Sequence, residues 1–465
     1  MVKTRIFAAI ICCFFLLSCA STHTSLKHYA PADRAVLRGD YPYAIGQINA
    51  QQKKAYKQKD RVLWYLDMGM LHHYNGDYEK SNHFLTLAEN SIEELFTKSI
   101  SKAGLSLLLN DNATEYSGEE YEDIYLNVFK ALNYLHLGRF DNSFVEINRV
   151  NHKLNMLEDK NRKLDDSFNR SKDKKIDLKP LSLKFYNDAL ARYLSSLLYY
   201  TDNKYDDAQI DLNKIDEAFL NQSQIYDFSP PDFKKYLTPT KKVKVNILAF
   251  GGRSAVKTAK SLFIHTEKDV AFISTTKKSE IGEKELTYLD FFQWYGLEEG
   301  YHFKFQLPEL KKRPSKIARV VVKDSTSHLA TLQLIEDVDN VAKHTYQAKY
   351  MRTYIKTITR TITKGILAKK ASEEINSQLG GSHLTQRLVA LGVSLGTDAT
   401  ENADLRISRY FPKKAYVGQI ELERGIHNLQ VDYLDSSGKV LFSKNFHNIL
   451  AEKDRLNLIE VYYPR

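Results

Sequence analysis

The stretch Leu63–Glu89, LWYLDMGMLHHYNGDYEKSNHFLTLAE, decides the fold of the first half of the chain. Apolar residues recur at helical spacing on both sides of Gly76-Asp77-Tyr78. Gly76 suits a tight turn, because glycine adopts backbone conformations that other residues avoid. The small residues Gly69 and Ser81 allow the flanking helices to approach closely. The stretch therefore predicts two helices that fold back on one another.

The same stretch resembles a tetratricopeptide repeat, and its turn recurs three times in weaker form. The residues at the spacing of that motif are Gly69, Gly76, Tyr78, Ser81, Leu85 and Ala88. The weaker turns are Gly39-Asp40-Tyr41, Gly138-Arg139-Phe140 and Asn203-Lys204-Tyr205. The four turns lie 37, 62 and 65 residues apart, so the longer intervals must hold extra helices or loops beyond a repeat of about 34 residues. We expect a tetratricopeptide-like α-solenoid over residues 30–225.

After Pro230-Pro231 the pattern changes from helical spacing to short apolar runs that are typical of strands. The expected strands are Val243–Phe250, Ser261–Thr266, Ala271–Thr275, Lys316–Lys323, Leu329–Ile335, Tyr416–Leu422, His427–Tyr433, Val440–Phe446 and Leu456–Tyr462. One long helix is expected over residues 338–370. The predicted fold class is α+β: the solenoid, then a mixed α/β domain over 240–411, then a small antiparallel β unit over 412–465.

The N-terminus has the pattern of a bacterial lipoprotein signal. Lys3 and Arg5 precede the apolar run Ile6–Leu17, which is too short to span a bilayer. The run ends in Leu16-Leu17-Ser18-Cys19, which resembles a lipobox. We expect a signal peptide over 1–18, lipidation of Cys19 and a lipid-anchored tether over 19–29, with Ala20 directing the protein to the outer membrane. A plain signal peptide or an N-terminal anchor helix are the alternatives.

Composition excludes several classes of protein. The three cysteines all lie within the first nineteen residues, so the rest of the chain has no disulfide, Cys-ligated metal or cysteine nucleophile. The 67 Lys and Arg against 57 Asp and Glu give a net charge of +10, a mild excess for 465 residues. This excess fits a protein near anionic envelope polymers or lipid headgroups and does not indicate nucleic-acid binding.

Five segments together resemble a family of Gram-negative outer-membrane lipoproteins with tetratricopeptide-like repeats, for which no activity is established. The first is a loop rich in acids and tyrosines, formed by Asn110, Asp111, Asn112, Tyr116, Gly118, Tyr121 and Glu122. The others are Val145–Arg149, Gly251–Lys257, Ile358–Lys364, and Ala403–Arg406 leading to Phe411-Pro412. The resemblance implies a place in the cell envelope, since family members often neighbour lipoproteins of envelope biogenesis, including activators of peptidoglycan synthases.

Two constellations raise the question of catalysis or cofactor binding. Gly392–Gly396 matches the G-x-S-x-G elbow, and Ser394, Asp404 and His427 follow in the order of an α/β-hydrolase. The flanking residues 384–391 look helical, so close helix packing explains the two glycines more simply. Gly251–Thr258 nearly matches a phosphate-binding loop, but Val256 stands where the second glycine is needed.

Metal binding receives little support from the sequence. Adjacent His72 and His73 diverge on a helix, and no pair of histidines has chelating spacing. The acidic cluster over 111–123 lacks the alternation of an EF-hand loop. We expect no metal, no cofactor and no catalysis.

A basic stripe lies on the predicted long helix. Its members recur every four residues: Arg352, Lys356, Arg360 and Lys364. Either this stripe is the solvated side of a helix that packs on a core, or it faces an anion such as a lipid headgroup, a glycan polymer or an acidic partner.

The concave face of a helical-repeat solenoid commonly binds partners. The corresponding groove positions here are Leu66, Met70, His73, Tyr74, Val128, Leu132, His136, Tyr193 and Tyr200. These apolar and aromatic residues either hold a partner or pack on inserted segments of the same chain.

We therefore predict a non-enzymatic outer-membrane lipoprotein, facing the periplasm, that acts as a protein-interaction scaffold in cell-envelope biogenesis or maintenance. Its expected partner is an envelope protein, and peptidoglycan or anionic lipid are possible further partners. We expect the acyl chains to bind the membrane, and we expect no binding of nucleic acid. The alternatives are an envelope hydrolase that uses Ser394, Asp404 and His427, and an anionic-polymer-binding protein that uses the basic stripe.

Overall fold

The structure is a computed structural model that describes residues 26–101, 111–170, 178, 181–278, 284–325, 327–379, 402–453 and 455–465. The expected signal peptide, Cys19, Asn110 and Ser394 lie outside these ranges. Within the described residues, no helix combines the length and the apolar character needed to cross a membrane.

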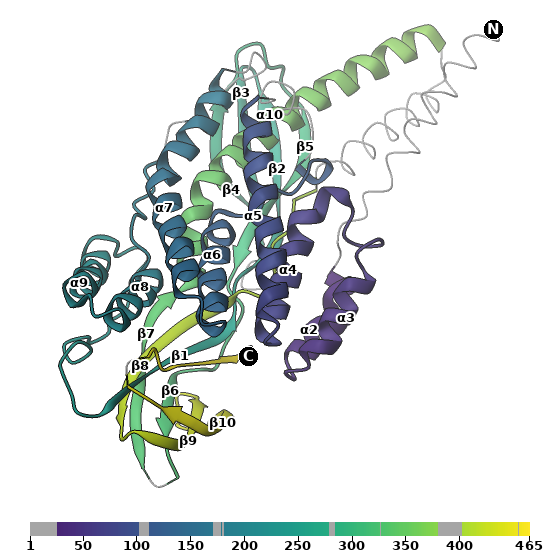
Figure 1. Cartoon of the computed structure of the whole chain (residues 1–465). Helices are drawn as coiled ribbons and strands as arrows, with labels where there is room; N and C mark the ends of the chain where they lie inside the picture. Colours follow the sequence, from purple (N-terminus) through teal and green to yellow (C-terminus); the bar gives the residue numbers. More distant parts are fainter. Residues whose placement is uncertain are drawn as a thin grey trace.

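The first half of the described chain forms four helical hairpins (Figure 1). They are α2 (Leu26–Val36) with α3 (Tyr41–Ala50), α4 (Arg61–Tyr74) with α5 (Tyr78–Ser101), α6 (Glu120–His136) with α7 (Phe140–Asn169), and α8 (Ala189–Thr201) with α9 (Tyr205–Asn221). Two short 3₁₀ helices, η2 (Gln58–Asp60) and η3 (Asp111–Ala113), lie in the connections between hairpins.

All four predicted turns are confirmed. The residue that makes each turn has a positive φ: 75° at Gly39, 80° at Gly76, 68° at Gly138 and 60° at Asn203. The aromatic residue two positions later begins the second helix of each hairpin. Gly69 is needed for close packing, because a Cβ there would lie 2.6 Å from the Leu85 side chain.

Seven strands form a mixed, nearly closed, barrel-like sheet at one end of the molecule (Figure 1). They are β1 (Val243–Arg253), β6 (Arg319–Lys323), β7 (His328–Asp337), β8 (Pro412–Leu422), β9 (Gly425–Leu434), β10 (Val440–Ala451) and β11 (Leu458–Tyr463). Their order is β10-β9-β6-β7-β8-β1-β11, with β1 and β11 parallel. The two edge strands do not pair with one another, but their side chains touch, since Phe442 of β10 stacks on Tyr463 of β11 with 4.9 Å between ring centroids.

The expectation of a small antiparallel unit over 412–465 is wrong in its pairing. Strand β8 pairs with β1 and β7, β9 pairs with β6, and β11 pairs with β1. The C-terminal strands therefore complete a sheet that begins at Val243. Alternation of apolar residues marks a strand but carries no information about a pairing partner far away in sequence.

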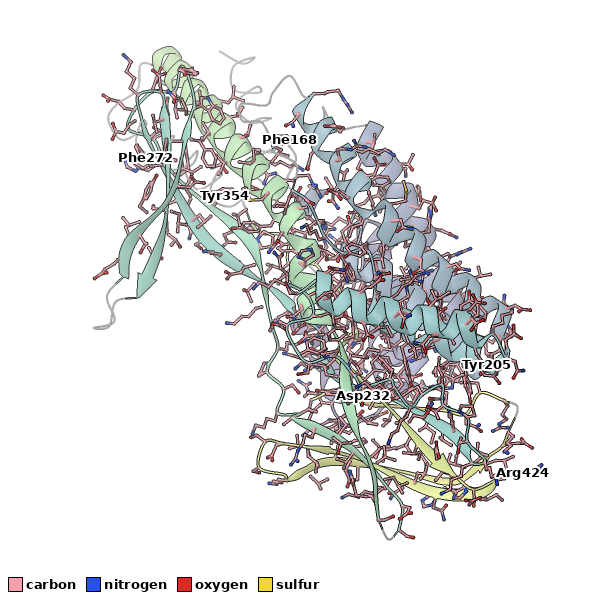
Figure 2. The ribbon with its side chains drawn as sticks, turned by 90° about the vertical axis from the view of Figure 1, so that its left-hand side faces the viewer. Phe168, Tyr205, Asp232, Phe272, Tyr354 and Arg424 are labelled. Atoms are coloured by element: carbon pink, nitrogen blue, oxygen red, sulfur yellow. The ribbon has the colours of Figure 1, made fainter. Side chains whose placement is uncertain are left out.

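A second, four-stranded antiparallel sheet packs against the long helix. Its strands are β2 (Val256–Glu267), β3 (Val270–Lys278), β4 (Lys284–Gln293) and β5 (His302–Lys311), in the order β4-β3-β2-β5. The helix α10 (Val338–Leu379) runs further than the predicted 338–370 and buries Ile355, Ile358 and Ile362 against this sheet. Figure 2 shows α10 between the four-stranded sheet and the helical hairpins.

The helical hairpins and the seven-stranded sheet share one hydrophobic core. Leu66 and Phe129 of the hairpins belong to the same buried cluster as Phe250 of β1, Val417 of β8 and Phe411. The two regions are therefore joined through their interiors.

Candidate functional site: a mixed-charge pocket beside α10

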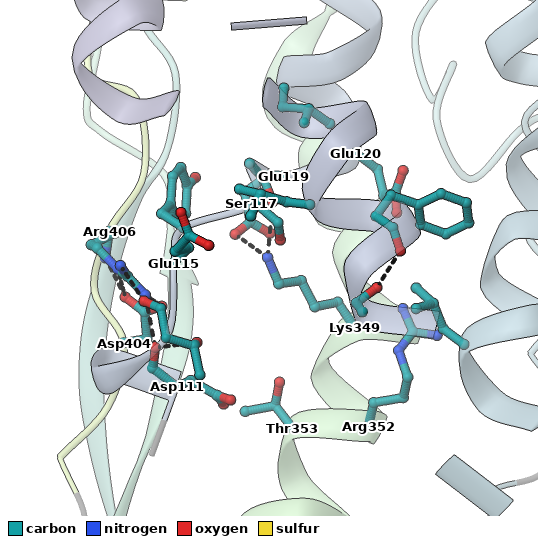
Figure 3. A pocket seen from close by; sticks show the side chains of 18 of the residues that line it. Asp111, Glu115, Ser117, Glu119, Glu120, Lys349, Arg352, Thr353, Asp404 and Arg406 are labelled. Carbon is teal, nitrogen blue, oxygen red and sulfur yellow. Dashed lines mark hydrogen bonds and ion pairs between the residues drawn. The ribbon is translucent and has the colours of Figure 1, made fainter. Parts of the chain in front are cut away.

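A cavity of about 580 Å³ lies where the helical hairpins meet α10 and the connection before α6 (Figure 3). Most of its lining residues belong to α5, the segment 111–120, α7 and α10. Three of the segments that carry the family resemblance meet here, through Asp111, Lys257 and Asp404. We call this cavity the pocket.

The segment that precedes α6 is held in place by backbone contacts and a capping box. Glu119 caps α6, and the Glu122 side chain accepts from the Glu119 backbone N–H at 2.8 Å. Gly118 has a φ of 79°. Arg406 donates to the backbone carbonyls of Asp111 at 2.8 Å and Thr114 at 3.0 Å. A residue nearly 300 positions later in the chain thus fixes this segment.

Glu119 is the centre of an ion-pair network on one wall of the pocket. Its Oε1 accepts from Lys257 Nζ at 2.5 Å and from Lys349 Nζ at 2.7 Å. Lys349 also donates to the carbonyl of Gly118 at 3.0 Å. Burial alone would raise the pKa of Glu119, but the two lysines hold it below its ordinary value.

Glu122 is buried behind this wall, and neutral groups donate to its carboxylate. It accepts from the Tyr116 hydroxyl at 2.8 Å and from the Ser408 backbone N–H at 2.6 Å. Burial, together with the nearby charge of Glu119, raises the pKa of Glu122 to about 7. One acid of this cluster is therefore ionised and its neighbour titrates near neutral pH.

Tyr116 joins three separate elements through its ring. The cationic groups of Lys257, Lys349 and Arg406 lie 5.9, 5.8 and 5.4 Å from the ring centroid. Cations within about 6 Å of an aromatic face are attracted by its quadrupole. The ring therefore helps to bind β2, α10 and the segment 402–411 to one another.

The basic stripe of α10 is largely neutralised inside the chain. Arg352 pairs with Asp165 of α7 at 2.8 Å and Lys356 pairs with Asp111 at 2.7 Å. The Arg360 side chain is buried and Lys364 is half-buried. Arg352 and Lys356 line the pocket next to Lys349, since positions 349, 352, 353 and 356 share one helix face. The stripe therefore faces acids of the helical region.

The groove positions are filled by the same chain. Leu66, Met70, Val128, Leu132 and Tyr193 are buried, and Tyr200 lies 4.7 Å from the ammonium of Lys244 on β1. The Tyr74 hydroxyl donates to the Tyr410 carbonyl at 3.0 Å, and its ring stacks on Tyr462 at 4.0 Å. Of the two alternatives for the groove, packing on segments of the same chain is the one observed.

His73 and His136 also face the C-terminal strand and share one carboxylate. Both Nε2 atoms lie 2.7 Å from oxygens of Glu460 on β11. His73 Nδ1 lies 2.7 Å from Asn133 Oδ1, and the Asn133 amide nitrogen is already donating to Ser81 and Asn82. Both ring nitrogens of His73 therefore face acceptors, which requires the imidazolium form. Burial opposes this charge, but Glu460 raises the pKa of His73 overall.

The residues of the alternative hydrolase are not brought together where they are described. Both carboxylate oxygens of Asp404 accept from Arg406, at 2.9 and 2.8 Å, whereas His427 Nε2 lies 2.8 Å from the carbonyl of Glu423. Ser394 lies outside the described ranges. Across the part of the chain that the structure describes, no three His, Cys, Asp or Glu side chains are grouped to hold a metal.

Several residues of the site were not predicted. Glu119 belongs to the acidic cluster that was considered for calcium and Lys349 to the basic residues of the long helix, but neither was among the predicted site residues, although Lys349 lies one helical turn before Arg352 on the same face. Lys257 and Arg406 lie in stretches that the resemblance had marked, but their partners are distant in sequence.

No protein-family model, curated protein or solved structure matches the chain.

Proposed function

We propose that the protein is a non-enzymatic interaction scaffold of the cell envelope, lipid-anchored to the outer membrane at Cys19 and facing the periplasm. The lipobox-like sequence at its N-terminus supports the anchor. The four helical hairpins support a tetratricopeptide-like solenoid, in which the groove serves internal packing. The partner therefore docks elsewhere.

The pocket is the docking site that we propose, and the mixture of charges on its walls is the observation that carries the proposal. Its seven cationic residues are Lys98, Lys160, Lys257, Lys349, Arg352, Lys356 and Arg406. Its six acidic residues are Asp111, Glu115, Glu119, Glu120, Asp123 and Asp404. A polyanion meets repulsion from the carboxylates, whereas a segment with charges of both signs finds complementary groups.

The apolar part of the lining fits the same ligand class. Leu95, Phe96, Leu164 and Phe168 contribute carbon surface next to the charged groups. A peptide segment of an envelope protein carries apolar, basic and acidic side chains together, unlike a lipid headgroup or a glycan. We therefore propose a polypeptide segment of mixed charge as the ligand.

Calorimetry with the full-length lipidated protein in detergent tests this proposal. The probe is a synthetic peptide that alternates leucine with lysine and aspartate, and polyglutamate is the comparison. Thr353 lines the pocket and takes no part in the ion pairs described above. Thr353→Trp should therefore fill the cavity and leave those ion pairs in place. We expect this variant to weaken peptide binding at least tenfold.

The matched control is Met351→Trp, because Met351 lies on α10, is exposed and is absent from the lining of the pocket. It should bind the peptide like the unaltered protein. Stronger binding of polyglutamate would favour the anionic-polymer alternative. Release of fragments from peptidoglycan by the purified protein would favour the hydrolase alternative, and either result would overturn the proposal.

A further inference from the structure

Two histidines lie side by side on the outer face of the four-stranded sheet. His265 of β2 is directly opposite His302 of β5 in their antiparallel register, and both side chains are exposed. The neighbouring Ile264 points to the other face and packs in the core that contains α10 residues. Figure 2 shows Phe272, the partner of His265 on β3, on the side of the sheet that faces away from Tyr354 and α10. The pair is therefore open to solvent, and neither histidine lines the pocket.

The two imidazole rings converge toward their Nδ1 atoms. The two Nδ1 atoms lie 3.1 Å apart, whereas the ring centroids lie 4.5 Å apart. A metal ion that binds two histidine nitrogens at about 2.0–2.1 Å holds them about 2.8–3.0 Å apart at a right angle and about 3.3–3.4 Å apart at the tetrahedral angle. The separation of His265 and His302 falls between these two values. It therefore fits two nitrogens that share one metal ion.

Glu267 orients the ring of His265. Its Oε1 lies 3.0 Å from His265 Nε2. An ionised carboxylate can only accept a hydrogen bond, so the neutral ring carries its proton on Nε2 and presents the Nδ1 lone pair toward His302. Histidines that bind metals commonly donate their other nitrogen to a carboxylate, which fixes the ring and raises its basicity. Glu267 therefore prepares His265 as a metal ligand.

This end of the sheet is acidic on balance. The loop before β5 lies beside β2, because the Thr266 hydroxyl donates to the Glu298 carbonyl at 2.8 Å and the Gly300 N–H donates to the Thr266 carbonyl at 2.9 Å. Over residues 265–269 and 296–304, the Asp, Glu, Lys and Arg residues are Glu267, Lys268, Asp269, Glu298, Glu299 and Lys304. Four acids against two bases create a local field that attracts a cation.

We propose that His265 and His302 form a binding site for a divalent late transition metal, zinc or copper, which clips β2 to β5. Neutral imidazole suits these metals, whereas magnesium and calcium prefer oxygen ligands. Two protein ligands leave coordination positions open to water, unlike the four protein ligands of a closed structural zinc site. Spacing along the chain does not reveal the pair, because 37 positions separate the two histidines. The proposal is independent of the function proposed for the pocket.

Calorimetric titration of the full-length lipidated protein in detergent with zinc chloride tests the site. His302→Ala should weaken zinc binding at this site roughly tenfold or more, because it removes one of two protein ligands. The matched control is His328→Ala, at an exposed histidine of β7 whose Nε2 lies 3.3 Å from the Thr331 hydroxyl, and this variant should bind zinc unchanged. Magnesium chloride should give no heat that depends on His302. The natural cysteines lie within the first nineteen residues and are the same in every variant.

Two further variants separate ligation from a structural effect. His302→Cys supplies a thiolate, which also binds zinc, and should recover much of the affinity that His302→Ala loses. Glu267→Gln should weaken zinc binding about tenfold, since Glu267 acts through His265. Electron paramagnetic resonance of bound copper should show two imidazole nitrogens in the unaltered protein and in Glu267→Gln, and one in His302→Ala.

Equal zinc affinity of the unaltered protein and His302→Ala would overturn the proposal. A copper spectrum with one imidazole nitrogen or none in the unaltered protein would also contradict it. The same loss of zinc binding in His328→Ala as in His302→Ala would place the metal elsewhere and refute the site. Circular dichroism of each variant separates loss of metal binding from loss of folding.

Discussion

Ser408 and Arg409 present their backbone N–H groups to two buried carboxylates on different helices. Ser408 donates to Glu122 of α6 at 2.6 Å, and Arg409 donates to Asp67 of α4 at 3.0 Å. Burial raises the pKa of Asp67 to about 6 and that of Glu122 to about 7. These two acids therefore attach the segment 402–411 to the helical region with a strength that depends on pH.

Stability should fall as pH rises from 5 to 7, and Glu122 is one cause. Folded Glu122 keeps its proton up to about pH 7, whereas the unfolded carboxyl loses it near its ordinary value of 4.5. The folded state binds more protons in this window, so the free energy of unfolding decreases with pH, by an amount on the order of 3 kcal/mol. Urea denaturation across this range should show a smaller slope for Glu122→Gln. An unchanged slope would contradict this account.

His73 adds a second pH-dependent term of the same sign. Its folded pKa is raised by Glu460, so its contribution is complete below about pH 6.5, the unfolded value, and is lost as pH rises through the folded value. Glu460→Gln should remove the ion pair, destabilise the protein by about 3 kcal/mol and lower the titration midpoint of His73 below 6.5. Histidine ring NMR measures that midpoint. A midpoint that does not move would show that Glu460 is not responsible.

The helix α10 depends on one glycine where it crosses β5. A Cβ at Gly365 would lie 2.1 Å from the Phe303 ring, which is packed in the core of the four-stranded sheet. Gly365→Ala should therefore destabilise the protein by about 1–3 kcal/mol, although alanine is the better helix former. Thermal unfolding measures the effect.

Gly46→Ala is the matched control for that substitution. Gly46 lies in α3, and nothing lies within 4 Å of a Cβ placed there. The higher helix propensity of alanine should stabilise this variant by up to about 1 kcal/mol. Opposite signs for the two substitutions would separate the steric effect at Gly365 from helix propensity. Destabilisation by both would contradict the argument.

At the scale of elements, local chemistry determined what could be predicted. The helical hairpins were predictable because each turn contains a glycine or asparagine, followed two residues later by an aromatic residue that starts a helix. Strands β4 and β5 were missed, because β4 mixes charged with apolar residues and β5 contains Pro308. Those features mark edge strands, which follow the strand pattern less closely than buried ones.

The pocket was only partly predictable for a related reason. Asp111, Tyr116, Arg352 and Lys356 were all singled out from the sequence, but as a loop and a stripe with separate roles. Their contact depends on packing α10 against α7, which involves residues nearly two hundred positions apart. Charge on a helix face does not reveal whether acids of another element will cover it.

On the scale of the whole molecule, two tryptophans report on different regions. Trp64 lies in α4, and Trp294 lies in the core between the four-stranded sheet and α10. Because α10 contacts both regions, we expect them to unfold together. The variants Trp64→Phe and Trp294→Phe each keep one tryptophan, so the fluorescence of each reports on one region. After subtracting the effect of each substitution on the free energy of unfolding, the two variants should give the same urea midpoint. Two separate midpoints would show that the regions fold independently.

The parallel pairing of β1 with β11 has a consequence for how the chain is made. Leu458 lies beside Asn246, more than two hundred residues earlier, and β11 is the last strand that the structure describes. During synthesis, the apolar residues that β11 and the segment 402–411 cover remain uncovered until β11 itself has been made. A newly made chain therefore exposes apolar surface for a long time and is prone to aggregate. We expect loss of a holding chaperone to lower the yield of folded protein, while the free energy of unfolding of the folded protein stays unchanged.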